Sequence, residues 1–243
     1  MVPIEKRHSP ERVAIVRWAA QMGAVTAEAL AVREQVSIAS ARGRLLAATR
    51  EGLLLRRRPL SAQPALFSAT RAGMRSADVC GLQPARVGAA NAHHTILCAG
   101  VAAALERSYP SHEVMGEREL RREEHQRGAP VASAVLGSAP DGTRLLHRPD
   151  LVIWPRVGCR LPVAVEVELT IKAPRRLLAI CRAWARCGCV DGVLYIAPTE
   201  VQRALARAIE GAQAGDRIAL ITPSAIGPEQ LADSAQRTIP VEL

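Results

Sequence analysis

Two neighbouring stretches decide the fold of the second half of the chain: Arg148-Pro149-Asp150-Leu151-Val152-Ile153, and Val163-Ala164-Val165-Glu166-Val167-Glu168-Leu169-Thr170-Ile171-Lys172. Apolar runs of this kind are typical of buried strands. A buried carboxylate without a partner is costly, and it tends to take up a proton instead. The acidic residues at the ends of these runs therefore indicate a site, since core packing gives no reason for them.

The two stretches predict adjacent strands over residues 148–154 and 162–170. Side chains alternate along a strand, so Glu166, Glu168 and Thr170 are expected on one face. Lys172 joins them if the strand extends that far, and Asp150 heads the neighbouring strand at the same end. Carboxylate oxygens gathered in this way suit Mg²⁺ or Mn²⁺. The predicted metal ligands are Asp150, Glu166 and Glu168, and Lys172 is predicted to orient water or stabilise charge on a phosphate.

The lysine is unusual in this chain, which has 30 arginines and only two lysines. The other one, Lys6, lies near the N-terminus. Lysine is a compact charge that can lose its proton when it is buried, whereas arginine cannot. The choice of lysine beside the acids suggests a chemical role at position 172.

The first third of the chain predicts three short helices and a hairpin. Ser9-Pro10-Glu11 begins the first helix and Gly23 ends it, while Thr26 caps a second helix that runs through Ala31. A third helix is expected from Ser37 to Arg50. Two strands, over residues 52–59 and 65–70, follow around a turn.

This order is typical of a winged helix-turn-helix, whose third helix enters the DNA major groove. The side chains predicted to contact DNA are Ser37, Ser40, Arg42, Arg44 and Arg50 on the third helix and Arg56, Arg57 and Arg58 on the hairpin. The alternative is a protein-interaction module whose arginines are merely solvated.

Charge and composition narrow the class of protein. Most of the net charge of +9 lies in the first 90 residues, which favours a nucleic-acid partner. We expect no membrane span, because no apolar run approaches about 18 residues, and no signal peptide begins the chain. A cytoplasmic protein with reduced cysteines follows. Cys181, Cys187 and Cys189 lack zinc-site spacing and are interpreted as core residues.

The remaining segments complete an α/β (α+β) architecture in which a winged helix-turn-helix (residues 1–75) precedes an αβα sandwich (residues 92–224). The predicted intermediate segments are a connector over 76–91, a helix over 92–107, a strand over 112–121, a loop or hairpin over 122–143, a helix beginning at Pro174, a strand over 190–197, a helix over 200–209, a strand over 217–222 and a tail over 225–243. Strands that alternate with helices indicate sheet layers covered by helices.

The acidic pattern resembles the PD-(D/E)xK nuclease superfamily. Asp150 matches the aspartate of that motif and Glu166 its second acid. The motif lysine falls at position 168, where this chain has Glu168, so Lys172 is a relocated equivalent under this resemblance. A further acid often contributes in that superfamily, and the candidates here are Glu106, Glu117 and Glu119.

Taken together, the motifs resemble the replication-relaxation family of plasmid and mobile-element proteins. The matching segments are residues 66–73, the His93-His94 helix, residues 116–120, residues 148–152 and residues 165–170. The resemblance implies a DNA-binding protein of plasmid replication or transfer, with double-stranded DNA as partner and a homodimer as one possible assembly. It leaves the roles of His93 and His94 open.

Two alternatives stand beside an active Mg²⁺-dependent phosphodiesterase. A nuclease-like domain that has lost catalysis would hold DNA or dimerise, and the protein would then be a non-catalytic transcriptional or replication regulator. Alternatively, Glu166 and Glu168 are solvent-facing strand residues paired with Arg148, Arg175 and Arg176.

Overall fold

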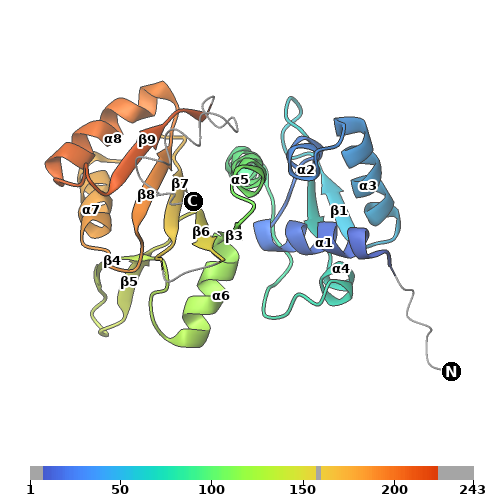
Figure 1. The fold of residues 1–243 in the computed structure, drawn as a ribbon, viewed down its shortest axis with the longest axis horizontal. Helices are drawn as coiled ribbons and strands as arrows, with labels where there is room; N and C mark the ends of the chain where they lie inside the picture. The colour runs from blue at the N-terminus through green and yellow to red at the C-terminus, as the bar shows by residue number, and fades with distance from the viewer. Residues whose placement is uncertain (1–7, 157–159, 224–243) are drawn as a thin grey trace. The chain divides into compact units, whose positions relative to one another are not determined.

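The computed structural model describes residues 8–156 and 160–223 (Figure 1). The chain divides into two compact units, Met1–Gly100 and Val101–Leu243, and helix α5 (Ala89–Ser108) runs across the division. Helices and separate β-sheets confirm the mixed α+β class. The segment expected as a tail, residues 225–243, lies outside the described residues. No helix within the described ranges has the length and hydropathy needed to cross a membrane.

The first unit begins with three helices and a hairpin, in the order that the sequence predicts. Its elements before α5 are α1 (Pro10–Met22), α2 (Ala27–Glu34), α3 (Ile38–Arg50), β1 (Leu54–Arg57), β2 (Leu66–Ala69) and α4 (Arg71–Ser76). The side-chain oxygens of Ser9, Thr26 and Ser37 accept backbone N–H groups at the three helix starts. These caps are the local signals that set the helix boundaries. Helix α4 is not predicted by the sequence, although Thr70 caps it in the same way.

One apolar core joins α1, α2, α3 and the β1–β2 hairpin. Trp18, Leu30, Leu45 and Phe67 contribute its largest fully buried side chains. The hairpin is antiparallel, and Val25 adds an isolated bridge to Phe67 through backbone hydrogen bonds of 3.0 and 2.9 Å. The segment between α1 and α2 is therefore attached to the hairpin. This attachment fixes where α2 and α3 begin relative to the hairpin.

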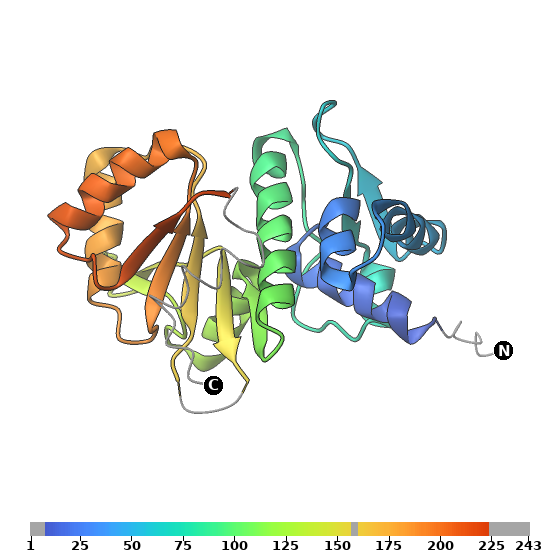
Figure 2. The same ribbon diagram turned by 45° about the horizontal axis from the view of Figure 1, so that its top comes forward.

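The second unit contains a five-stranded sheet. Its elements after α5 are β3 (His112–Gly116), α6 (Glu117–Arg127), β4 (Ala134–Ser138), β5 (Arg144–His147), β6 (Leu151–Pro155), β7 (Val163–Val167), α7 (Pro174–Ala185), β8 (Gly192–Ile196), α8 (Thr199–Gly211) and β9 (Ile218–Ile221). The strand order is β3-β6-β7-β8-β9, while β4 and β5 form a separate hairpin. The first three strands are antiparallel neighbours, and β7, β8 and β9 are parallel. Figure 2 shows these strands side by side.

The strand expected over residues 112–121 is wrong beyond Gly116, because Glu117 begins α6. Acidic residues in the first turn favour a helix N-terminus, and here Glu117 pairs with Arg121 one turn later at 2.5 Å. These helical pairings outweigh the alternating pattern that suggests a strand. Of the loop or hairpin expected over residues 122–143, the first part is wrong, because α6 continues to Arg127, whereas β4 and β5 form the expected hairpin.

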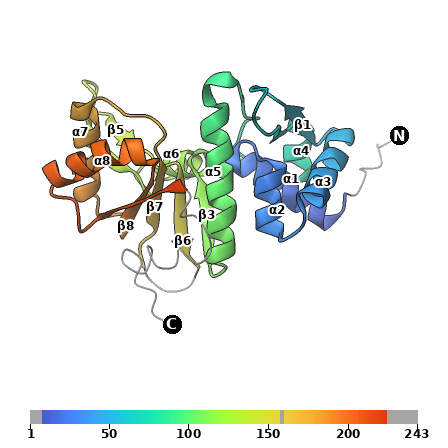
Figure 3. The same cartoon turned by 90° about the horizontal axis from the view of Figure 1, so that it is seen from above.

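The sheet is buried on both faces. Helices α7 and α8 pack together along one face, as Figure 3 shows, against Ala164, Val193 and Tyr195. Residues of the opposite alternation, such as Val165 and Leu194, are equally buried. This is the burial expected of strands joined by helical crossovers. A charged group near the middle of this sheet must therefore find a partner inside the protein.

Gly73 on α4 provides a test of packing in the first unit. A Cβ atom at this position would lie 2.1 Å from the carbonyl oxygen of Leu53. We expect Gly73→Ala to lower the free energy of unfolding by about 1–3 kcal/mol, or more if the backbone cannot move. Urea denaturation followed by circular dichroism measures the change.

Gly43→Ala is the matched control, because no atom lies within 4 Å of a Cβ built at that helical position. This substitution should raise the free energy of unfolding by up to about 1 kcal/mol through helix propensity. Equal effects of the two substitutions would contradict the close approach of α4 to Leu53.

Candidate functional site

The acidic residues meet at one end of the β6–β7 pair. These strands are antiparallel, with Leu151 opposite Val165, so the start of β6 lies beside the end of β7. Asp150 precedes β6, and its Oδ2 accepts the backbone N–H of Val167 at 2.7 Å. The backbone oxygen of Asp150 accepts the N–H of Glu117 at 2.9 Å. Asp150 is thus fixed between β7 and the first turn of α6.

Glu166 points into the protein from β7. Its relative exposure is 5%, and its Oε1 lies 2.6 Å from Nε2 of His147. The His147 ring contacts Trp184 edge to face, with centroids 5.8 Å apart. Burial raises the pKa of Glu166, and the charge of Asp150 raises it further, whereas His147 and Lys172 oppose the shift. Glu166 therefore holds a proton more readily than an ordinary glutamate.

Glu168 and Lys172 form a second pair beside it. The strand predicted through Thr170 ends at Val167, although the N–H of Glu168 still donates to the Ile196 carbonyl at 3.0 Å. Glu168 is 5% exposed, and its Oε2 contacts Nζ of Lys172. Burial lowers the pKa of Lys172, while the charges of Glu166 and Asp150 oppose that shift. Lys172 therefore contacts Glu168 from the segment after β7, and its position does not come from the alternation of side chains along the strand.

The four predicted residues thus form one electrostatic cluster with one direct pair, Glu168 with Lys172, while Glu166 pairs with His147 from outside the set. Within the ranges that the structure describes, Asp150, Glu166 and Glu168 do not bring one oxygen each within 4.8 Å of one another. A cation held by all three carboxylates would therefore require their side chains to move. The donor atoms are carboxylate oxygens, which suit a hard cation such as Mg²⁺.

His147 and Glu124 are site residues that the sequence interpretation missed. Glu124 on α6 is buried and accepts the Nε–H of Arg148 at 2.8 Å and the N–H of Val131 at 3.1 Å. Arg148 therefore pairs with Glu124. The burial of Glu166 and Glu168 also contradicts the alternative in which they face solvent. A single histidine carries no spacing signal, and only its place just before Arg148-Pro149-Asp150 could have indicated His147.

The sequence also raised two further acids and two histidines, and each lies on a helix. Glu119 on α6 is buried and lies 3.7 Å from Arg122. Glu106 lies half-buried on α5. On the same helix His93 is exposed, and Nε2 of His94 lies 3.4 Å from Sγ of Cys98, one turn away.

A second feature lies in the first unit, where α2, α3 and the hairpin enclose a cavity of about 240 Å³. Its lining residues are Ala27, Glu28, Arg42, Leu46, Arg56, Arg58, Pro64, Ala65 and Phe67. We call this cavity the arginine groove, because three arginines face a single acid. Glu28 lies 3.9 Å from Arg42, so it neutralises the groove only in part.

Helix α3 exposes most of its first two turns. Ala41, Leu45 and Ala48 form its buried stripe, while Ser40 and Arg42 are exposed. The Ser37 oxygen accepts the N–H of Ser40 at 3.1 Å and so caps the helix. These exposed turns are the part of α3 that a ligand of the first unit can contact.

The predicted DNA-contacting arginines fall into two groups. Arg42, Arg56 and Arg58 line the arginine groove. Arg57 is exposed on β1 and Arg50 at the end of α3, and neither lines the groove. Arg44 pairs with Glu11 of α1 at 2.5 Å. The structure thus brings together three of the six predicted arginines.

Comparison of the chain with protein-family models, with curated proteins and with solved structures found no match in any of the three. The geometry of the two features is therefore the basis for a functional proposal.

The raised pKa of Glu166 predicts a pH-dependent contribution to stability. A glutamate whose pKa is raised by folding stabilises the native state most below its ordinary pKa, and this contribution is lost as pH rises through the folded pKa. Glu166→Gln removes the titration. The free energy of unfolding of the wild type, relative to this variant, should fall by up to about 1.4 kcal/mol per pH unit within that window.

Denaturant unfolding of both proteins from about pH 4.5 upward measures this difference. Other groups titrate in both proteins, so their contributions largely cancel. A constant difference across the range would mean that folding does not change the pKa of Glu166.

Proposed function

We propose that the chain is a double-stranded DNA-binding protein whose first unit is a winged helix-turn-helix. In this assignment α2 and α3 are the helix-turn-helix and the β1–β2 hairpin is the wing. The arginine groove carries the proposal, because Arg42, Arg56 and Arg58 converge from a helix and a hairpin on one concavity. Binding to the DNA backbone depends on neutralising phosphates with cationic side chains in this way.

Helix α3 has the surface required of a recognition helix. Ser40 and Arg42 lie on its exposed first turns, together with Gly43, which leaves room for a close backbone approach. Ile38 is 46% exposed at the helix start, where an apolar side chain can contact a thymine methyl group. Phosphate contacts from the groove would position the helix, and these residues would contact base edges.

Arginine substitutions test the proposed DNA-binding surface. We expect Arg42→Ala, Arg56→Ala and Arg58→Ala each to weaken binding to duplex DNA and to reduce the salt dependence of the binding constant by about one ion. Arg75→Ala is the matched control, since this exposed arginine lies on α4 and does not line the groove. Fluorescence anisotropy at several salt concentrations measures both quantities. Equal losses in all four variants would indicate non-specific attraction, and no loss would exclude the groove.

The second unit supports a proposal of a PD-(D/E)xK-like αβα domain that acts as a Mg²⁺- or Mn²⁺-dependent phosphodiesterase. Asp150, Glu166 and Glu168 would hold the cation, which would supply Lewis acidity at a phosphate oxygen. The carboxylates fit this role because their oxygens are the donors that a hard cation prefers, and a bound cation would compensate the buried charge of Glu166. Lys172, held at Glu168, would stabilise negative charge that develops on the phosphate.

A non-catalytic regulator is the second candidate, and a specific observation favours it. Glu166 already pairs with His147, and Glu168 with Lys172, so both buried acids have partners within the chain. The second unit would then bind DNA or dimerise without cutting. In either case, a role in plasmid or mobile-element replication or transfer rests on the motif resemblance.

Incubation with supercoiled plasmid separates the two candidates. With Mg²⁺ or Mn²⁺ present, we expect nicking or linearisation by the wild type and at least about a hundredfold loss in Asp150→Asn and Glu166→Gln. Glu210→Gln should retain activity, because that acid is exposed on α8. Cleavage that persists in Asp150→Asn would reveal a contaminant. Intact plasmid together with salt-sensitive binding would establish the regulator.

A further inference from the structure

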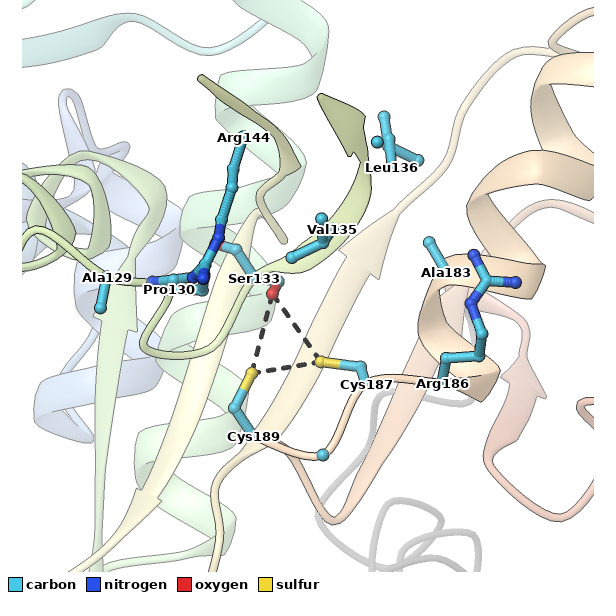
Figure 4. A pocket seen from close by; sticks show the side chains of 12 residues that line it. Ala129, Pro130, Ser133, Val135, Leu136, Arg144, Ala183, Arg186, Cys187 and Cys189 are labelled. Atoms are coloured by element: carbon cyan, nitrogen blue, oxygen red, sulfur yellow. Dashed lines mark hydrogen bonds between the residues drawn. The ribbon is translucent and has the colours of Figure 1, made fainter. Parts of the chain in front are cut away.

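Two cysteines lie in contact in the turn between α7 and β8. The Sγ atoms of Cys187 and Cys189 are 3.1 Å apart, and each lies 3.7 Å from the carbonyl oxygen of Ser133 (Figure 4). Only Gly188 separates the two residues, and a Cβ at that position would meet no atom within 4 Å. The fold thus holds the two thiols together on a short turn with free space beside Gly188.

The contact favours the thiolate form of Cys187 over that of Cys189. A hydrogen bond from Cys189 lowers the pKa of Cys187 to about 6, and the charge of Arg217 adds to this shift against the effect of burial. The same contact raises the pKa of Cys189. The negative end of the α7 dipole opposes a thiolate here. Arg217 offsets that effect, since its Nη2 donates to the carbonyls of Cys187 and Val190 at 2.7 Å each.

Both cysteines line a cavity of about 670 Å³ between the end of α7 and the β4–β5 hairpin. Arg144 and Arg186 are among its lining residues, and none of the described lining residues is acidic. Val135 and Leu136 give it an apolar side (Figure 4). Ser133 also lines the cavity, and its buried Oγ has no hydrogen-bond partner among the described residues. The cavity therefore offers two cations, apolar surface and an unsatisfied hydroxyl beside a thiol pair.

Other thiols in the described part of the chain lack this combination. Cys181 is fully buried, and burial raises its pKa to about 11. Cys80 is exposed, with its Sγ 3.8 Å from Asp78, and Cys98 is half-buried, with its Sγ 3.4 Å from His94. Thiol reactivity requires a thiolate together with access. Within residues 8–156 and 160–223, the Cys187–Cys189 pair combines a thiol of lowered pKa, a second thiol and an adjoining cavity.

We propose that Cys187 and Cys189 form a thiol–disulfide exchange site for a small disulfide, RSSR, that carries anionic groups. The Cys187 thiolate attacks one sulfur of RSSR, forms a mixed disulfide and displaces RS⁻. The leaving RS⁻ takes the Cys189 proton. Cys189 then attacks Sγ of Cys187 and displaces the second RS⁻, which is protonated from water. Starting from the Cys187 thiolate, the protein loses two electrons and one proton, water supplies the second proton, and RSSR becomes two RSH molecules.

The proposed product is a disulfide that reduces readily. Residues two positions apart close a small ring, and strained disulfides have more oxidising potentials than structural ones. The site would therefore cycle between dithiol and disulfide and would not act as a permanent cross-link. The proposal concerns the second unit alone and is independent of DNA binding and of cleavage.

Glutathione disulfide is a suitable probe, because it is small and carries carboxylates. The full chain would be reduced, freed of reductant, exposed to this probe near pH 7, quenched with an alkylating agent and mapped by mass spectrometry. We expect a Cys187–Cys189 disulfide that dithiothreitol reverses, and alkylation of Cys187 in the reduced protein at least about tenfold faster than that of Cys80. Equal alkylation rates, or no coupled loss of the two thiols, would overturn the proposal.

Variants resolve the individual steps. Cys189→Ser should accumulate the mixed disulfide on Cys187, whereas Cys187→Ser should lose the rapid reaction. Arg144→Ala with Arg186→Ala should slow the reaction with glutathione disulfide, but not the reaction with uncharged hydroxyethyl disulfide. Equal slowing with both probes would overturn the assignment of an anionic substrate.

Zinc binding gives a further test. If the wild type bound stoichiometric zinc and the cysteine variants did not, the pair would be a metal site and the exchange proposal would be overturned. The mapping of the wild type needs no variant, so a folding defect leaves the proposal testable.

Discussion

The burial of charge in a sheet that is covered on both faces is the constraint on which the second unit depends. Such a sheet offers no water to an ionised side chain, so each charge needs a partner within the protein. Glu166 pairs with His147, Glu168 with Lys172 and Glu124 with Arg148. These partners come from β5, from the segment after β7 and from the segment before β6. The ion pairs therefore join the β4–β5 hairpin and α6 to the sheet.

The two units differ in where their charged side chains lie. In the first unit the groove arginines stay near water, so their mutual repulsion is screened and their charge remains available to a polyanion. In the second unit the acids are buried, and burial itself shifts the pKa of Glu166 and of Lys172. Shifted pKa values are common at catalytic sites, but structural ion pairs produce them too. The charge pattern thus favours DNA binding more strongly than it favours catalysis.

Local signals made much of the fold predictable from sequence. The caps at Ser9, Thr26 and Ser37 define three helix starts, and the apolar runs locate β7, β8 and β9. The failures have a common physical cause. The alternation over residues 112–121 concealed the helical pairs of α6. Long-range partners leave no local signal, so the pairing of Glu124 with Arg148 and the contact of His147 with Glu166 appear only in three dimensions. The contact between Cys187 and Cys189 likewise depends on the turn that follows α7.

The pairing of the buried acids does not by itself exclude a metal. A cation must compete with Lys172 and His147 for the same carboxylates, and this competition weakens binding. Lys172 is nevertheless a weak competitor, since burial already lowers its pKa and added positive charge would lower it further. If Lys172 lost its proton, a neutral amine would remain beside Glu168. Keeping a neutral amine in a buried site costs less free energy than separating a charged ammonium group from Glu168. Arginine could not yield in this way, because its guanidinium keeps its proton in proteins. Lys172, the single lysine of the second unit, therefore lies beside the acids, where a side chain that can lose its charge would compete least with a bound cation.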